Sequence, residues 1–150
     1  MNKINTIVLY SESDKAFQEE FQDSVVMISR TIADISYLKI EDITQNNIDS
    51  LLSLDIKLVI FLYSSKLNAK LDKIANIMPD LYAQQEAKSK RFVVVRLVLC
   101  DSSGYFIDKL SAIPNMPNGE KCIGYPKNDL MWYEVAKRLR VTMNNMLGIV

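Results

Sequence analysis

A run of apolar residues near the middle of the chain is the strongest structural signal in the sequence. Every position from Leu58 to Tyr63 is apolar, within the stretch KLVIFLYSS at 57–65. A strand with this pattern has no face that suits water, so we expect it at the centre of a parallel sheet with helices on both sides. Ser64 and Ser65 follow at its carboxyl end, and in open α/β sheets ligands bind at that edge.

Three further apolar runs, rich in β-branched residues, predict the neighbouring strands. They lie at Thr6–Tyr10, at Ile35–Leu38 and at Phe92–Leu99, the last of which is apolar except for Arg96. Cys122–Gly124 is a candidate for a short strand at the edge of the sheet. The chain therefore offers five strands.

Apolar side chains at helical spacing predict helices between these strands. After the first strand, Ser11 or Ser13 can cap a helix with Asp14 in its first turn. The inward positions of that helix are Phe17, Phe21, Val25, Ile28 and Ile32. After the second strand, Thr44 is expected to cap a helix whose inward positions are Ile48, Leu51 and Leu52.

Two more helices are expected in the second half of the chain. The one after the central strand has apolar positions from Leu67 to Met78, and Pro79 predicts a kink or break near Ile77 because proline lacks an N–H. The last helix is capped by Asn128 or Asp129. Its inward stripe is Trp132, Val135, Leu139, Met143 and Met146, which is typical of a core rather than of a cofactor site.

Strands that alternate with helices predict the fold class. We expect an α/β, flavodoxin-like doubly wound domain with a five-stranded parallel sheet in the strand order 2-1-3-4-5. A chain of 150 residues fits a single domain covering 1–150, which would bury ~70% of the surface of the unfolded chain. Its last residues carry no polar tail, as in one domain of a longer protein.

The composition removes several classes of function. The chain has no histidine, which excludes Ser-His-Asp and Cys-His catalysis and imidazole metal sites. Cys100 and Cys122 are too few for a disulfide framework and lack metal-site spacing, so we expect buried thiols and no metal. Lys and Arg equal Asp and Glu at 18 each, so no net field favours nucleic acid.

Targeting signals and nucleotide motifs are also missing. No apolar run approaches the ~18 residues of a membrane helix, and the apolar run at the start of the chain is too short for a signal peptide. We therefore expect a cytoplasmic protein that binds neither membrane nor nucleic acid. The four glycines match neither GxGxxG nor a P-loop. A response-regulator receiver is disfavoured because Ser64 and Ser65 stand where its phosphate-accepting Asp is expected.

Hydroxyl groups gather at the predicted sheet edge instead. Tyr10, Ser11, Ser64 and Ser65 end or follow the first and central strands, so they are the candidate ligand-binding residues. Serines at these positions also serve as helix caps, and both interpretations stay open.

The order of three motifs resembles TIR (Toll/interleukin-1 receptor) domains of bacterial type. The first motif is IVLYSESDKAFQEEF, a strand ending in a Tyr-Ser turn before an acidic helix start. The second is LVIFLYSSKL, the central strand with its serine. The third, in 94–140, combines a strand, a Cys-Asp turn, a Leu-x-Ala-x-Pro segment and a helix that carries Trp132 and ends in Arg. The resemblance covers nearly the whole chain.

The resemblance implies a function through assembly. TIR domains are flavodoxin-like modules that associate with one another, so other TIR domains, homotypic or heterotypic, are the expected partners. The loop Ile40, Glu41, Asp42 and Ile43 lacks the glycine and proline often found there in the family. Its two apolar side chains beside two acids suit a self-association contact. The alternative, that both isoleucines close the sheet edge, stays open.

Some TIR domains also release nicotinamide from NAD, using a glutamate on the helix after the central strand. In this sequence Ile77 stands at the position expected for that glutamate, and an isoleucine cannot stabilise an oxocarbenium-like ribose. The nearest acids are Asp72 and Asp80. We therefore predict no catalytic residue and no cofactor.

Two hypotheses follow. The first, which we favour, is a non-catalytic TIR-like interaction module in bacterial immune or stress signalling. The second is an NAD-cleaving enzyme (NAD glycohydrolase), with NAD as substrate and a displaced carboxylate from Asp72 or Asp80. The side chains that contact Ser11 and Ser64 distinguish them.

Overall fold

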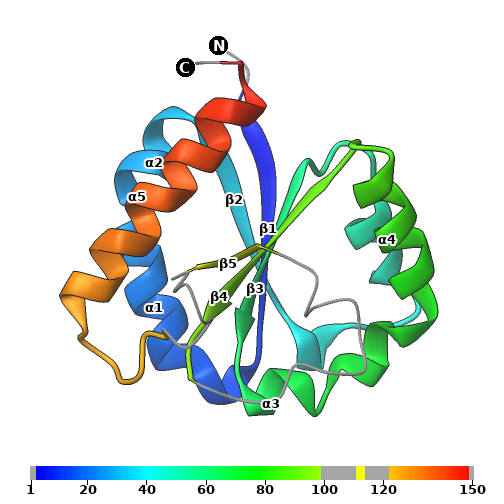
Figure 1. Cartoon of the computed structure of the whole chain (residues 1–150). Helices are drawn as coiled ribbons and strands as arrows, with labels where there is room; N and C mark the ends of the chain where they lie inside the picture. Colours follow the sequence, from blue (N-terminus) through cyan, green and yellow to red (C-terminus); the bar gives the residue numbers. More distant parts are fainter. Residues whose placement is uncertain (1–2, 99–110, 114–121, 149–150) are drawn as a thin grey trace.

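A parallel β-sheet forms the centre of the molecule (Figure 1). The computed structural model describes residues 3–98, 111–113 and 122–148. The strands lie in the order β2-β1-β3-β4-β5, and each neighbouring pair is parallel. Their bounds are β1 Ile4–Tyr10, β2 Ala33–Lys39, β3 Leu58–Tyr63, β4 Arg91–Arg96 and β5 Ser111–Ile113.

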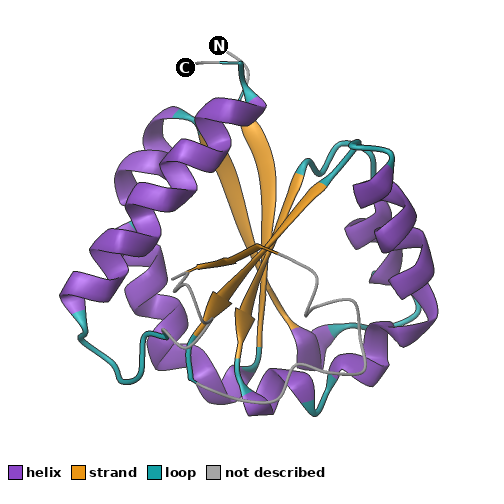
Figure 2. Cartoon of the chain, viewed as in Figure 1, coloured by secondary structure: helices purple, strands orange, loops and turns teal. Residues whose placement is uncertain are grey.

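Helices cover both faces of this sheet, as Figure 2 shows. One face carries α1 (Lys15–Ser24), α2 (Val26–Thr31) and α5 (Asp129–Met146). The other carries the 3₁₀ helices η2 (Ile40–Asp42), η3 (Ile48–Leu52) and η4 (Leu71–Ile77), with α3 (Ser65–Asn68) and α4 (Met78–Glu86). A further 3₁₀ turn, η1 (Glu12–Asp14), leads from β1 into α1. The result is a doubly wound α/β layer structure.

The central strand β3 is buried on both sides, as its sequence predicts. All six residues are buried, and they alternate between two hydrophobic clusters. Leu58, Ile60 and Leu62 pack toward α1, α2 and α5, whereas Val59, Phe61 and Tyr63 pack toward α3, η4 and α4. A strand that supplies both cores must be apolar at every position.

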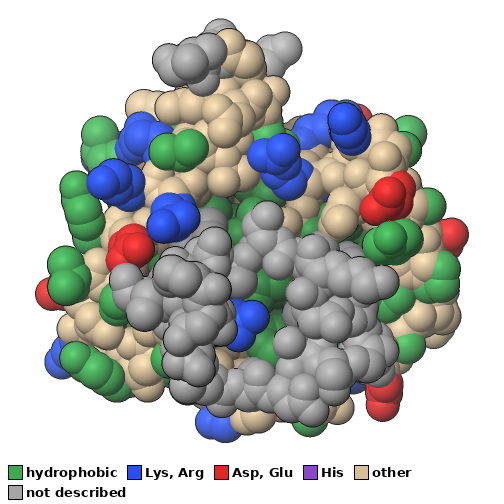
Figure 3. Space-filling view, in the orientation of Figure 1, with side chains coloured by type: hydrophobic (Ala, Val, Ile, Leu, Met, Phe, Trp, Pro, Cys, Tyr) green, Lys and Arg blue, Asp and Glu red, His purple; other side chains and the backbone are tan. Residues whose placement is uncertain are grey.

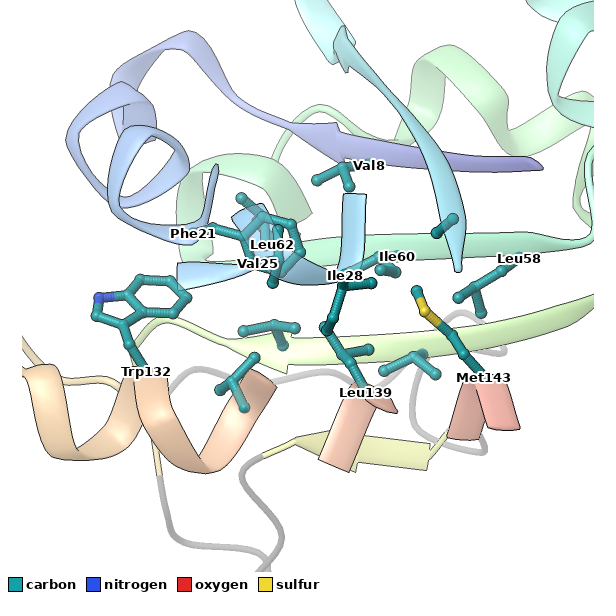
Figure 4. Packing of buried hydrophobic residues seen from close by; sticks show 14 of the residues in the cluster. Val8, Phe21, Val25, Ile28, Leu58, Ile60, Leu62, Trp132, Leu139 and Met143 are labelled. Carbon is teal, nitrogen blue, oxygen red and sulfur yellow. The ribbon is translucent and has the colours of Figure 1, made fainter. Parts of the chain in front are cut away.

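The core beneath α5 contains the lone tryptophan (Figure 4). Trp132 is 3% exposed, and its ring meets Phe21 edge-on at a centroid distance of 6.1 Å. Val135, Leu139 and Met143 continue the buried stripe along α5. The prediction that Trp132 belongs to the core is confirmed.

The sheet confirms the predicted order for β2-β1-β3-β4 and differs at its edge. The fifth strand is the three-residue β5, not Cys122–Gly124. That predicted segment instead runs beside the end of β4, where the Ile123 and Gly124 amides donate to the Arg96 and Leu97 carbonyls. Two backbone bonds align it with the sheet without making a regular strand.

The helices also differ in detail from the sequence pattern. The predicted α-helix between β2 and β3 is wrong, since this segment forms the short 3₁₀ helices η2 and η3. Thr44 does not cap a helix, and its backbone amide donates to Asn47 Oδ1. The predicted break near Ile77 is confirmed, since η4 ends there and α4 starts at Met78 with Pro79 in its first turn. Proline fits that turn because its missing N–H has no helical partner there.

The other predicted elements have mixed outcomes. The Asn128 side chain caps α5 as expected, accepting from the Met131 amide. Cys122 is a free, partly buried thiol. Cys100 and the predicted strand end at Leu99 lie outside the described residues.

Candidate functional site

The carboxyl ends of β1 and β3 meet at one edge of the sheet, beside α3 (Figure 1). The strand order reverses here, because β1 pairs with β2 on one side and β3 on the other. In doubly wound sheets this switch point is where ligands bind. Ser11 follows β1 and Ser64 follows β3, and both side chains are buried.

Ser64 connects the end of β3 to the start of α1. Its hydroxyl accepts from the Leu67 amide at 3.1 Å, which caps α3, and donates to the Asp14 carboxylate. Asp14 is itself buried. A carboxylate removed from water needs such a donor, so this contact satisfies Asp14 and fixes the Ser64 hydroxyl at the same time.

Ser11 is held by a different carboxylate, that of Glu41 in η2. The Ser11 hydroxyl donates to Glu41 Oε2 at 2.8 Å, and the Glu12 amide donates to Oε1 at 2.9 Å. Lys70, between α3 and η4, also donates to Oε2. Three donors from two separate segments therefore converge on one side chain.

These contacts set the charge of Glu41. Burial alone would raise its pKa, but the hydrogen bonds from Lys70, the Glu12 amide and the Ser11 hydroxyl outweigh burial and lower the pKa to about 2. Lys73 adds a bond from its ammonium to the Glu41 carbonyl oxygen at 2.9 Å. The group is an ionised acceptor near neutral pH, so it cannot serve as a general acid there.

The predicted ligand-binding residues divide into two pairs. Ser11 and Ser64 lie at the switch point, each on a carboxylate. Tyr10 is buried in the core beneath α1, and burial raises the pKa of its hydroxyl despite the opposing charge of Lys39. Ser65 is exposed at the first residue of α3. The edge therefore gathers two serines and two acids rather than four hydroxyls.

The three positions considered for catalysis lie in η4 and α4, the helices that follow α3. Ile77 is 5% exposed and belongs to the cluster beneath η4 and α4. Asp72 and Asp80 are exposed, in η4 and α4. The acids bonded to Ser11 and Ser64 are instead Glu41 and Asp14.

The loop predicted for self-association has the opposite exposure to the one expected. Ile40 and Ile43 are buried in the cluster shared by β1, β3 and η4, so the prediction of an exposed apolar pair is wrong. The isoleucines close the edge of the core, which was the alternative interpretation. Asp42 is exposed, and Glu41 is engaged with Ser11 and Lys70.

Two features of this site were not predicted from the sequence. Asp14 was assigned only to the first turn of a helix, and Glu41 only to a contact loop. Their partners lie 50 and 30 residues away in the chain, so no local spacing indicates the pairs. The available signal was topological: Asp14 follows β1 and Glu41 follows β2, and these two strands lie side by side in the sheet.

Other kinds of site are limited by the side chains present. Within 3–98, 111–113 and 122–148, no group of three or more His, Cys, Asp or Glu side chains is arranged to hold a metal ion. None of the helices in the described segments is long and apolar enough to cross a bilayer.

Comparisons with known proteins leave the family open. No protein-family model matches the chain, and no curated protein does. Among solved structures, the chain is similar to the solution structure of two-electron reduced flavodoxin from Megasphaera elsdenii. The TM-score is 0.39 and the identity 14%, over 89% of this chain and 99% of that chain. Likeness at this level carries no argument about function.

Proposed function

We propose that the chain is a TIR-like interaction module that acts through assembly with other TIR domains, in bacterial immune or stress signalling, and does not cleave NAD. The absence of NAD cleavage in this proposal is supported by how the acids at the sheet edge are engaged. Both carboxylates bonded to the serines there, those of Glu41 and Asp14, are held by hydrogen bonds within the protein. Ile77, at the position of the family glutamate, is in the core.

An exposed apolar surface on α5 supports the assembly part. Leu130 is 75% exposed and Tyr133 66%, and Val141 continues the same face of the helix. Lys137 lies between them, and Figure 3 shows hydrophobic side chains interspersed with Lys and Arg on the side of the molecule where α5 lies. Large exposed apolar side chains gathered on one helix mark a contact surface.

The neighbouring helix suggests that the partner is a second copy. The outer face of α1 carries the exposed acids Glu19 and Asp23, and α1 packs beside α5. A two-fold axis between two copies would set the acids of each α1 against Lys137 and Arg140 of the other α5, around the apolar centre. We therefore propose the α1–α5 face, defined by these residues with Leu130, Tyr133 and Val141, as the assembly surface.

Sedimentation velocity over a range of protein concentrations tests this surface. Wild type should associate, and Leu130→Glu should not. Leu54→Glu should behave as wild type, because Leu54 is also a large exposed apolar side chain but lies between η3 and β3, outside the α1–α5 face. Lys137→Glu should weaken association, and adding Asp23→Lys should restore it. A wild type that stays monomeric at the highest concentration, or a Leu130→Glu protein that associates equally well, would contradict the proposal.

One observation favours the alternative function, NAD cleavage with a displaced carboxylate. The Glu41 side chain is 23% exposed, ionised and bonded to the Ser11 hydroxyl, whereas Asp72 and Asp80 lie in η4 and α4. If the chain cleaves NAD, Glu41 is the carboxylate best placed to do so. That hypothesis requires nicotinamide release that Glu41→Gln abolishes.

A further inference from the structure

The group of donors around Glu41 has the composition of a phosphate site. A serine hydroxyl, a backbone amide and a lysine ammonium converge on a single anion, at distances of 2.8 Å from Ser11 and 2.9 Å from the Glu12 amide, with Lys70 as the third donor. Backbone amides and hydroxyls supply directed bonds to phosphate oxygens, and lysine supplies a point charge. We call these three donors the anion site.

We propose that Glu41 occupies the anion site as a built-in ligand, and that a phosphate group displaces its carboxylate. The site lies at the switch point between β1 and β3, where open α/β sheets bind their ligands. This inference concerns ligand binding at the sheet edge and goes beyond the assembly proposed for the α1–α5 face.

The backbone around Glu41 explains how the exchange happens. Ile40 and Ile43 are buried on either side of it, and Lys73 holds its carbonyl oxygen at 2.9 Å. The loop is therefore anchored, whereas the Glu41 side chain keeps 23% of its surface exposed. Rotation of this one side chain toward water vacates the three donors without moving the core.

Charge selects phosphate over a carboxylate ligand. A tethered carboxylate competes at a high effective concentration, so a free carboxylate of equal charge is at a disadvantage. A phosphate group carries about −1.5 to −2 at pH 7 and offers three acceptor oxygens. The surrounding charges are mixed: Glu12 and Asp42 oppose an anion, whereas Lys39, paired with Glu12 at 3.4 Å, and Lys73 favour it.

Amide NMR titration with inorganic phosphate, at constant ionic strength, tests the proposal through the Glu12 amide. In Glu41→Gln, phosphate should shift this signal saturably. Wild type should require a phosphate concentration at least about tenfold higher for the same shift, because its anion site is free of Glu41 only part of the time. Glu41→Asp, whose shorter side chain withdraws from the donors, should behave as Glu41→Gln and serves if that variant does not fold.

Matched lysine variants separate the site from general attraction. Adding Lys70→Gln to Glu41→Gln should abolish the response, whereas adding Lys66→Gln, an exposed lysine of α3, should leave it intact. A folded Glu41 variant whose Glu12 amide ignores phosphate would overturn the proposal. So would equal responses in wild type and variant, or equal loss with either lysine change. None of these outcomes bears on association through α5, so failure here is distinguishable from failure of the assembly proposal.

Discussion

Replacing Glu41 by Gln should destabilise the protein near neutral pH and remove part of its acid sensitivity. The pKa of Glu41 falls from 4.5 to about 2. At ~1.4 kcal/mol for each pKa unit, the ionised carboxylate stabilises the fold by at most about 3.5 kcal/mol. Water screens a side chain that keeps 23% of its surface exposed, so we expect a loss of about 1 to 2 kcal/mol for Glu41→Gln at pH 7.

The pH dependence follows from the sign of the shift. The pKa of Glu41 is lower in the folded state, so its stabilisation is fully present above 4.5 and is lost as the pH falls toward 2. Wild type and Glu41→Gln should therefore converge in unfolding free energy across that interval. Urea unfolding followed by far-UV circular dichroism, at pH 7 and at steps down to pH 3, measures this difference.

A matched control makes the Glu41 result specific. Glu86→Gln removes an exposed carboxylate of α4, outside the α1–α5 face, and should change stability by less than about 0.5 kcal/mol at every pH. Equal stability of wild type and Glu41→Gln at pH 7 would refute the argument that the three donors stabilise this carboxylate. A difference that persists unchanged to pH 3 would refute its electrostatic origin.

Three further changes test other parts of the structure. Trp132→Ala, which empties a site that is 3% exposed, should cost ~3 to 5 kcal/mol and lower the urea midpoint by about 2 M; an unchanged melting temperature would contradict its place in the core. Ile77→Glu should lower the free energy of unfolding by at least about 3 kcal/mol, because it buries an unpaired charge, and it should not confer nicotinamide release. A variant as stable as wild type would show that the side chain at 77 is not enclosed. Burial, and secondarily the charge of Lys57, lowers the pKa of Lys90 to about 8 in the folded state. Wild type should therefore gain stability relative to Lys90→Met as the pH rises from about 8 to 10.5, because the unfolded chain holds the proton more tightly; parallel curves of stability against pH would contradict this.

The fold was predictable where one local pattern determines the environment. Leu58–Tyr63 is apolar at every position, and only the centre of a parallel sheet buries both faces of a strand. Pro79 marked the break between η4 and α4 because proline restricts its own backbone. The short edge was not predictable, since β5 has three residues and its place depends on pairing with β4.

The candidate site was predictable only in its location. Strand ends identified Ser11 and Ser64, but their partners Glu41 and Asp14 depend on how η2 and η1, the turns after β2 and β1, are arranged at the end of the sheet. The exposure of Ile40 and Ile43 was wrongly predicted for a related reason. A two-residue apolar pattern beside charges is the same for a surface contact and for a loop that closes a core, and tertiary packing decides between them.

Nicotinamide release from NAD tests the central claim, a non-catalytic module, most directly. The assay uses concentrated protein with a crowding agent, so that the association proposed for the α1–α5 face is favoured during the measurement. Wild type, Glu41→Gln, Asp72→Ala and Asp80→Ala are compared under the same conditions. We predict that wild type releases no more nicotinamide than the three variants. Turnover by wild type that any one of these substitutions abolishes would contradict the account and identify the displaced carboxylate.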